Sequence, residues 1–165
     1  MIEKFYHHAF FGAAFFVFLY LSFTYNILLW DAAAFFCNAR VFAGIPSYFE
    51  WSRAPLWPII LSLWPDETFA RFLSAVFSTF LLIAVYILTR EIFGKDSAFF
   101  AALLLFFNPL FLFWSGAAYS DVPAILFLTL SLLFLIKDGK LNLYFSMLFF
   151  IMAFLTCLLY TSDAA

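Results

Sequence analysis

Residues 9–30 read AFFGAAFFVFLYLSFTYNILLW, an apolar stretch without Asp, Glu, Lys, Arg or His. An α-helix needs about 20 apolar residues to cross the hydrocarbon layer of a bilayer, and this stretch is long enough. It is also longer than the apolar core of a signal peptide and has no small-residue cleavage site. We therefore expect a retained transmembrane helix here.

The whole chain has the composition of a membrane protein. Of its 165 residues 67% are hydrophobic and 11% are charged, and the mean hydropathy is +1.05. A soluble domain carries roughly a quarter charged residues. The net charge of −2 provides no basic surface for a phosphate backbone, which argues against nucleic acid as a partner. Cys37 and Cys157 lie far apart in the sequence and show no metal-ligand spacing.

Charged residues divide the rest of the chain into four further apolar segments. They cover residues 68–88, 97–114 and 122–136, and the last begins near residue 141. The predicted fold is therefore an all-α integral membrane protein with about five transmembrane helices, the fifth of them truncated.

The connection over residues 31–66 is long, and its pattern predicts helices that lie along the membrane surface. One such helix begins at Asp31 and ends at Gly44, which suits a helix terminus. The apolar stretch 55–64 is too short to cross the membrane, and Pro58 is expected to break it.

The distribution of cations predicts the orientation, because short cytoplasmic loops are enriched in Lys and Arg. The short connections 89–96 and 137–140 are basic, which places the N-terminus in the cytoplasm and connection 31–66 outside. Five tryptophans then lie near the outer face as interfacial anchors: Trp30, Trp51, Trp57, Trp64 and Trp114. Arg71 is expected to extend toward the lipid headgroups.

Charged residues on that outer side suggest a reaction on a phosphate-linked lipid. Asp31 and Asp121 stand at the ends of separate helices, and Glu50 and Arg53 lie in the long connection. A carboxylate there could deprotonate an acceptor while a cation stabilises a departing phosphate. Structural roles also fit, since both aspartates suit helix N-termini and Glu50 and Arg53 could form a surface pair.

The order of these residues resembles a known family. The series comprises Asp31, the helix ending at Gly44, Tyr48-Phe49-Glu50, a basic residue, Ala54-Pro55-Leu56, Ala70-Arg71-Phe72-Leu73, Val85-Tyr86-Ile87-Leu88, Asn108-Pro109 and Tyr119-Ser120-Asp121. It is similar to the first outer loop and first four helices of GT-C-type glycosyltransferases, most closely the dolichyl-phosphate-mannose protein mannosyltransferase and lipid A aminoarabinose transferase group. The resemblance covers about residues 10–155 and corresponds to the N-terminal third or so of a full enzyme.

The resemblance implies an inverting glycosyltransferase. It would move a sugar from a polyprenyl-phosphate-sugar donor to a protein, lipid or glycan acceptor on the outer face of a bacterial or archaeal plasma membrane, in contact with membrane lipids. Asp31 corresponds to the family's general base, and Asp121 to an aspartate that shapes the site or its metal and phosphate environment. Glu50 corresponds to the loop glutamate and Arg53 to a phosphate contact. A divalent metal ion is left open, because Ala32 stands where many members have a second acidic residue.

A non-catalytic multi-pass membrane protein, such as a transporter fragment or an assembly subunit, explains the composition equally well. The helix centres carry few ionisable residues, which weighs against a transporter. Residues 1–156 are expected to be the N-terminal part of the glycosyltransferase domain. Residues 157–165 resemble the translated read-through of a sequencing adapter and are expected to be non-native. We expect this piece alone to be inactive.

Overall fold

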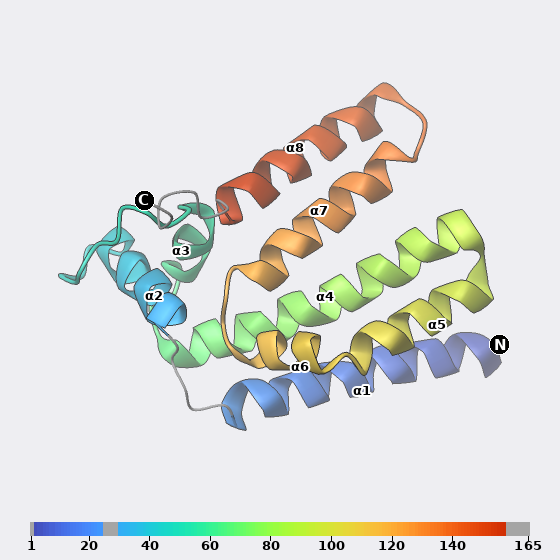
Figure 1. Ribbon diagram of the computed structural model, residues 1–165, viewed down its shortest axis with the longest axis horizontal. Coiled ribbons are helices and arrows are strands. Elements are labelled where there is room, and N and C mark those ends of the chain that lie inside the picture. The colour runs from blue at the N-terminus through green and yellow to red at the C-terminus, as the bar shows by residue number, and fades with distance from the viewer. Residues whose placement is uncertain (1, 25–29, 158–165) are drawn as a thin grey trace.

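The computed structural model describes residues 2–24 and 30–157, and these residues form eight α-helices and no strand. The elements are α1 (Ile2–Thr24), α2 (Trp30–Phe42), α3 (Leu56–Leu61), α4 (Glu67–Phe93), α5 (Lys95–Phe106), α6 (Pro109–Gly116), α7 (Asp121–Leu135) and α8 (Lys140–Thr156) (Figure 1). The predicted all-α class is confirmed. Most of the predicted tail, residues 158–165, lies outside the described residues.

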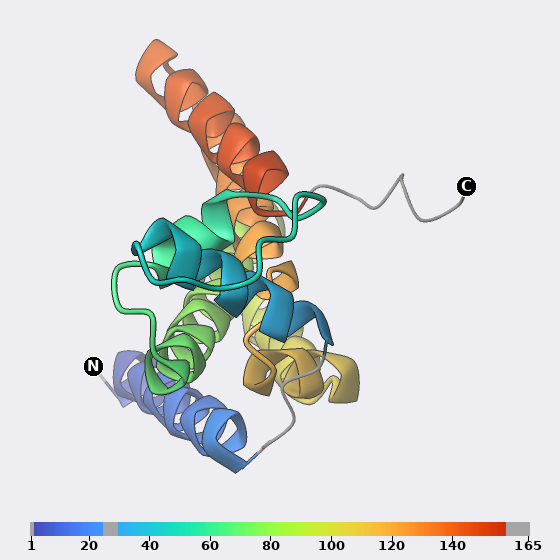
Figure 2. The same ribbon diagram turned by 90° about the vertical axis from the view of Figure 1, so that its left-hand side faces the viewer.

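Helix α4 is the centre of a bundle and contacts α1, α5, α6 and α7. Helix α8 packs along α7, while α2 and α3 lie together across one end of the bundle (Figures 1 and 2). The main core contains these buried side chains: Ala14, Phe18, Ala75, Leu81, Leu82, Ala84, Ala102, Phe111, Val122 and Leu126. Its alanines let the helix backbones approach closely, as is common between membrane helices.

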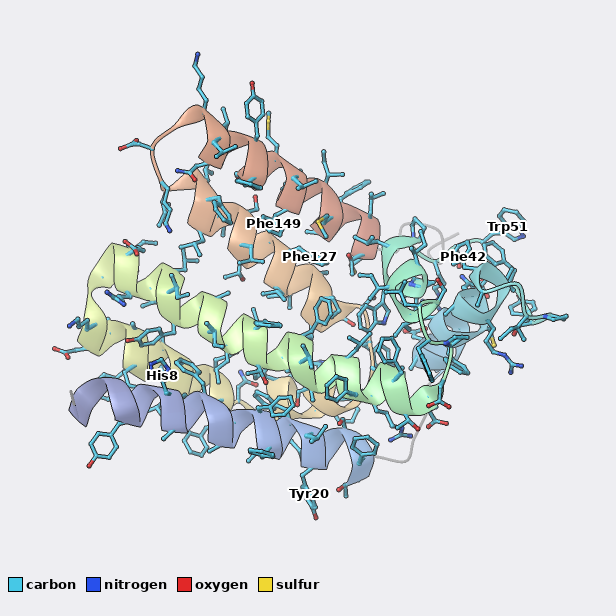
Figure 3. The ribbon with its side chains drawn as sticks, turned by 180° about the vertical axis from the view of Figure 1, so that it is seen from behind. His8, Tyr20, Phe42, Trp51, Phe127 and Phe149 are labelled. Atoms are coloured by element: carbon cyan, nitrogen blue, oxygen red, sulfur yellow. The ribbon has the colours of Figure 1, made fainter. Side chains whose placement is uncertain are left out.

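Aromatic rings and small polar groups pack between helices α7 and α8. Phe149 on α8 stacks on Phe127 of α7, with ring centroids 6.3 Å apart (Figure 3). It also stacks on Phe134 of α7, with centroids 5.6 Å apart. The buried hydroxyls of Ser131 and Ser146 lie 3.3 Å apart in the same interface. This pairing directs the C-terminal end of α8 back toward α3.

Among the described residues, α4 is the helix that is by itself long and apolar enough to cross a membrane. Asp66 begins it by accepting the N–H of Thr68 at 2.8 Å, and Gly94 ends it. Helices α5 and α6 pass the same test only as a pair, bent by 64°. Residues 8–24, α7 and α8 are shorter apolar helices, so five crossings remain a prediction.

Two predicted segments have different boundaries in the structure. The segment 97–114 was predicted to be continuous, but it is split into α5 and α6. Asn108 accepts the N–H groups of Leu110 and Phe111 at 2.9 and 3.2 Å, and Pro109 starts α6 without an N–H to donate. The segment 9–30 was predicted to end at Trp30, but Trp30 begins α2, and residues 25–29 lie outside the described residues.

Two predictions about surface anchors are wrong. Trp57 is completely buried, whereas Trp51 and Trp64 are exposed by 88% and 66%. Arg71 is also buried and does not extend to headgroups. It donates to the Ser22 carbonyl at 2.7 Å and pairs with Glu67, because the end of α1 lies beside the start of α4.

The prediction that Pro58 breaks its segment is also wrong. Pro58 lies within the first turn of α3, where a backbone N–H has no intrahelical partner in any case. Helix α3 therefore forms and packs against α2 at the end of the bundle.

Candidate active site

The loop after α2 folds back onto that helix. Gly44 has a φ of +78°, and Ile45 donates to the Arg40 carbonyl at 2.8 Å, which closes the helix end. The buried Asn38 then binds both backbone groups of Glu50. Its Nδ2 donates to the Glu50 carbonyl at 2.9 Å, and its Oδ1 accepts the Glu50 N–H at 2.7 Å. The loop is thus fixed to α2 three residues before Arg53.

This fold-back brings Arg53 to Asp31 in the first turn of α2. Arg53 Nη2 donates to Asp31 Oδ1 at 2.6 Å, and the guanidinium also lies over the ring of Phe35, 5.6 Å from its centroid. The side chain of Arg53 is 7% exposed and that of Asp31 is 37% exposed. Asp31 is therefore the accessible member of a half-buried ion pair.

Glu50 does not join this pair. Its carboxylate accepts the hydroxyls of Ser52 at 2.8 Å and Tyr48 at 3.4 Å. The structural alternative of a Glu50–Arg53 surface pair is therefore wrong, because the turn between these residues directs Arg53 toward α2 instead.

Asp121 comes from the other side of the fold, at the start of α7. Asp121 is the first helical residue and thus lies at a helix N-terminus as expected, but Ser120 occupies the cap position. The preceding turn packs on α2: Ala32, Ala117 and Tyr119 form one buried apolar cluster. Asp121 therefore lies at the N-terminal end of α7, where the helix dipole is positive.

Charges from three segments act on the Tyr119 hydroxyl. Burial raises the pKa of the Tyr119 hydroxyl, the negative charges of Asp31 and Asp121 raise it further, and the positive charge of Arg53 opposes them. The site therefore combines two carboxylates, one guanidinium and a protonated phenol.

The end of α8 reaches the same turn. Burial and the charge of Asp121 raise the pKa of the Cys157 thiol, while a hydrogen bond with Ser120 opposes them. Cys157 therefore lies beside the residues that begin α7.

Sequence reasoning missed Asn38 and Tyr119. Asn38 is an amide one turn from Phe35 on the buried side of an otherwise apolar helix, which could have marked it as a structural contact. Tyr119 directly precedes Ser120-Asp121, but nothing in the sequence indicates that its side chain is buried.

Residues 57–161 match the profile of a family described as dolichyl-phosphate-mannose-protein mannosyltransferase. The chain belongs to this family. The match includes Asp121, whereas Asp31, Glu50 and Arg53 precede it. No curated protein and no solved structure matches the chain significantly. Membership confirms the resemblance and places the chain in a membrane-associated family of glycosyltransferases.

The described part of this mannosyltransferase-family site shows no preformed metal centre. Among the described residues, no group of three or more His, Cys, Asp or Glu could hold a metal ion. The accessible carboxylate of Asp31 is instead paired with Arg53.

An apolar cavity of about 200 Å³ lies beside the site. Asp121 lines it together with residues of α4, α5, α6 and α7, among them Leu81, Leu105, Phe111 and Ile125. The carboxylate at the start of α7 therefore borders an apolar cavity.

Proposed function

We propose that the full-length protein is an inverting glycosyltransferase. It would transfer a sugar from a polyprenyl-phosphate-sugar donor to an acceptor at the outer face of the membrane. The observation that carries this proposal is the half-buried pair of Arg53 with the accessible Asp31. The charges of Asp31 and Asp121 both act on the Tyr119 hydroxyl. Family membership supports the reaction class.

In the proposed reaction, Asp31 takes the proton from the acceptor hydroxyl. The acceptor oxygen then attacks the anomeric carbon from the face opposite the phosphate, and its configuration inverts. The bond between that carbon and the phosphate oxygen breaks, and its electron pair leaves with the polyprenyl phosphate. Arg53 stabilises the charge that develops on this phosphate.

The ion pair gives Arg53 and Asp31 linked roles. A guanidinium binds phosphate in a bidentate fork, so an incoming donor phosphate would compete with Asp31 for Arg53. Movement of Arg53 toward the phosphate would leave the Asp31 carboxylate available for the acceptor proton. Asp121 and Glu50 are proposed to shape the site rather than to exchange protons.

We further propose that α1, α4, the α5–α6 pair, α7 and α8 cross the membrane with the N-terminus in the cytoplasm. The described start of α1 and the α4–α5 and α7–α8 turns lie toward one end of the bundle, while α2, α3 and the site lie at the other (Figure 1). The two turns at the first end carry Lys95 and Lys137, as cytoplasmic loops do. A bacterial or archaeal plasma membrane is the proposed location.

Asp31→Asn in the full-length protein tests the proposal. General-base catalysis contributes about 10²–10⁴-fold, so transfer should fall by that factor while expression is unchanged. Transfer would be measured in lipid nanodiscs from radiolabelled polyprenyl-phosphate mannose and related donors. Asp66→Asn is the matched control, because Asp66 is a solvent-exposed cap of α4 and asparagine also caps helices.

Near-normal transfer by Asp31→Asn would remove Asp31 as the base. A wild-type protein without transfer to protein, lipid or glycan acceptors would favour the non-catalytic membrane subunit.

A further inference from the structure

We propose that Trp57 is a positioning residue for sugar transfer. Its indole N–H holds the α6–α7 turn in the shape that sets Asp121 and Tyr119 opposite Asp31. The inference rests on the proposed function for its kinetic consequence, but the geometry it describes can be measured separately.

The turn contains an unusual backbone conformation. Ala118 has a φ of +54°, and it is the only non-glycine residue with a positive φ in the described part of the chain. An L-residue with a Cβ is disfavoured there, because the Cβ approaches the following carbonyl oxygen. The turn therefore needs a contact that holds it, since nothing in the alanine side chain favours this conformation.

Trp57 makes that contact across 61 sequence positions. Its Nε1–H donates to the Ala118 carbonyl at 3.2 Å, in a buried environment. Loss of this hydrogen bond would cost free energy, because the Ala118 carbonyl would remain buried without the Trp57 donor.

The donor itself is rigidly held. Trp57 is completely buried, and its ring meets Phe77 of α4 edge-on with centroids 5.4 Å apart. The same cluster contains Phe35 and Ala39 of α2 and Leu61 of α3. Trp57 thus links α3, to which it belongs, and the neighbouring α2 and α4 to the turn between α6 and α7.

The residues that follow Ala118 carry the chemistry. Tyr119 packs on Trp114 with centroids 4.7 Å apart and shares a buried cluster with Ala32, the neighbour of Asp31. Asp121 begins α7 three positions after Ala118. A return of Ala118 to an ordinary φ would redirect both side chains away from Asp31.

Trp57→Phe tests the proposal by removing the N–H while keeping an aromatic ring. Misplacement of a reacting group costs up to about 10²-fold, so kcat should fall about tenfold or more while donor KM changes less than about twofold. The matched control is Trp64→Phe, because Trp64 is exposed by 66%. It should keep wild-type kcat.

A second substitution separates positioning from general damage. Glycine adopts a positive φ without the steric penalty, so Ala118→Gly in the Trp57→Phe background should restore at least about half of kcat. If Trp57→Phe does not accumulate, Ala118→Val tests the same turn and should lower kcat alone.

A geometric readout is independent of activity. Ala32→Cys and Ala117→Cys, with Cys37 and Cys157 replaced by alanine, lie in one buried cluster and would be cross-linked as a disulfide by copper-phenanthroline oxidation in membranes. We expect a clear loss of cross-linking yield in the Trp57→Phe background. Unchanged cross-linking, or a kcat loss that Ala118→Gly does not rescue, would overturn the positioning role. If the wild type transfers no sugar, the proposed function fails, and the cross-linking yield still decides this inference.

Discussion

Arg53 reaches Asp31 across 22 sequence positions because Asn38 fixes the loop between them. Asn38 satisfies both backbone groups of Glu50 inside the protein, where an unmet hydrogen bond would cost about 1–3 kcal/mol. The ion pair therefore depends on a residue that carries no charge. The geometry of the site therefore depends on the placement of the backbone as well as on the ionisable side chains.

Arg53→Lys is expected to weaken donor use while keeping the charge. Lysine cannot form the bidentate guanidinium fork, so we expect donor KM to rise about tenfold and Arg53→Ala to raise it further. Steady-state kinetics with varied donor concentration would measure both. Arg90→Lys, exposed at the opposite end of α4, is the control and should be neutral. Unchanged donor kinetics in Arg53→Ala would exclude Arg53 as the phosphate contact.

Tyr119 predicts a pH dependence of stability. Because burial and two carboxylates raise its pKa above the ordinary value of 10.0, the folded protein holds the phenolic proton at pH values where the unfolded chain has lost it. The contribution of Tyr119 to the free energy of unfolding is therefore fully present below the ordinary pKa of 10.0. It is lost as the pH rises through the raised pKa of the folded state. Thermal unfolding between about pH 9 and 11 should show this fall, and Tyr119→Phe should reduce it. Equal slopes in both proteins would contradict the assignment.

Helices α5 and α6 show how a short sequence signal shapes an element. A single straight helix would continue past residue 107, but Asn108-Pro109 bends the path by 64°. The bend turns α6 against α1 and sets the direction in which residues 117–120 leave it. The bent α5–α6 pair thus sets the position of the α6–α7 turn, which Trp57 contacts.

Asn108→Ala should destabilise the protein by about 1 kcal/mol, because it removes the side-chain acceptor of two N–H groups. Asn108→Asp keeps an acceptor and should be nearly neutral. Thermal unfolding in detergent would compare the two variants. Equal stability of Asn108→Ala and the wild type would show that Pro109 alone sets the bend.

The whole molecule is polarised, with the candidate site at one end of the bundle and the basic turns toward the other (Figures 1 and 2). We predict that Ser52→Cys, in a background without Cys37 and Cys157, reacts in intact cells with a membrane-impermeant maleimide. Asp138→Cys should react only after permeabilisation. Both positions are exposed, so burial does not confound the comparison. The opposite labelling pattern would reverse the proposed orientation.

The sequence by itself determined the helical class, the approximate helix boundaries and the candidate residues Asp31, Glu50, Arg53 and Asp121. These follow from local properties, namely the length of apolar runs, the charges between them, and the cap and turn residues at their ends. The family resemblance depended on the same ordered residues, and the family match confirms it.

Only the tertiary structure decided which of these residues meet. It paired Arg53 with Asp31 rather than Glu50, buried Trp57 and Arg71, and brought Tyr119 into the site. Such contacts depend on how segments far apart in the chain pack. A local pattern cannot specify them. The residues beside a tryptophan in the sequence do not reveal whether a helix from elsewhere in the chain will cover its side chain.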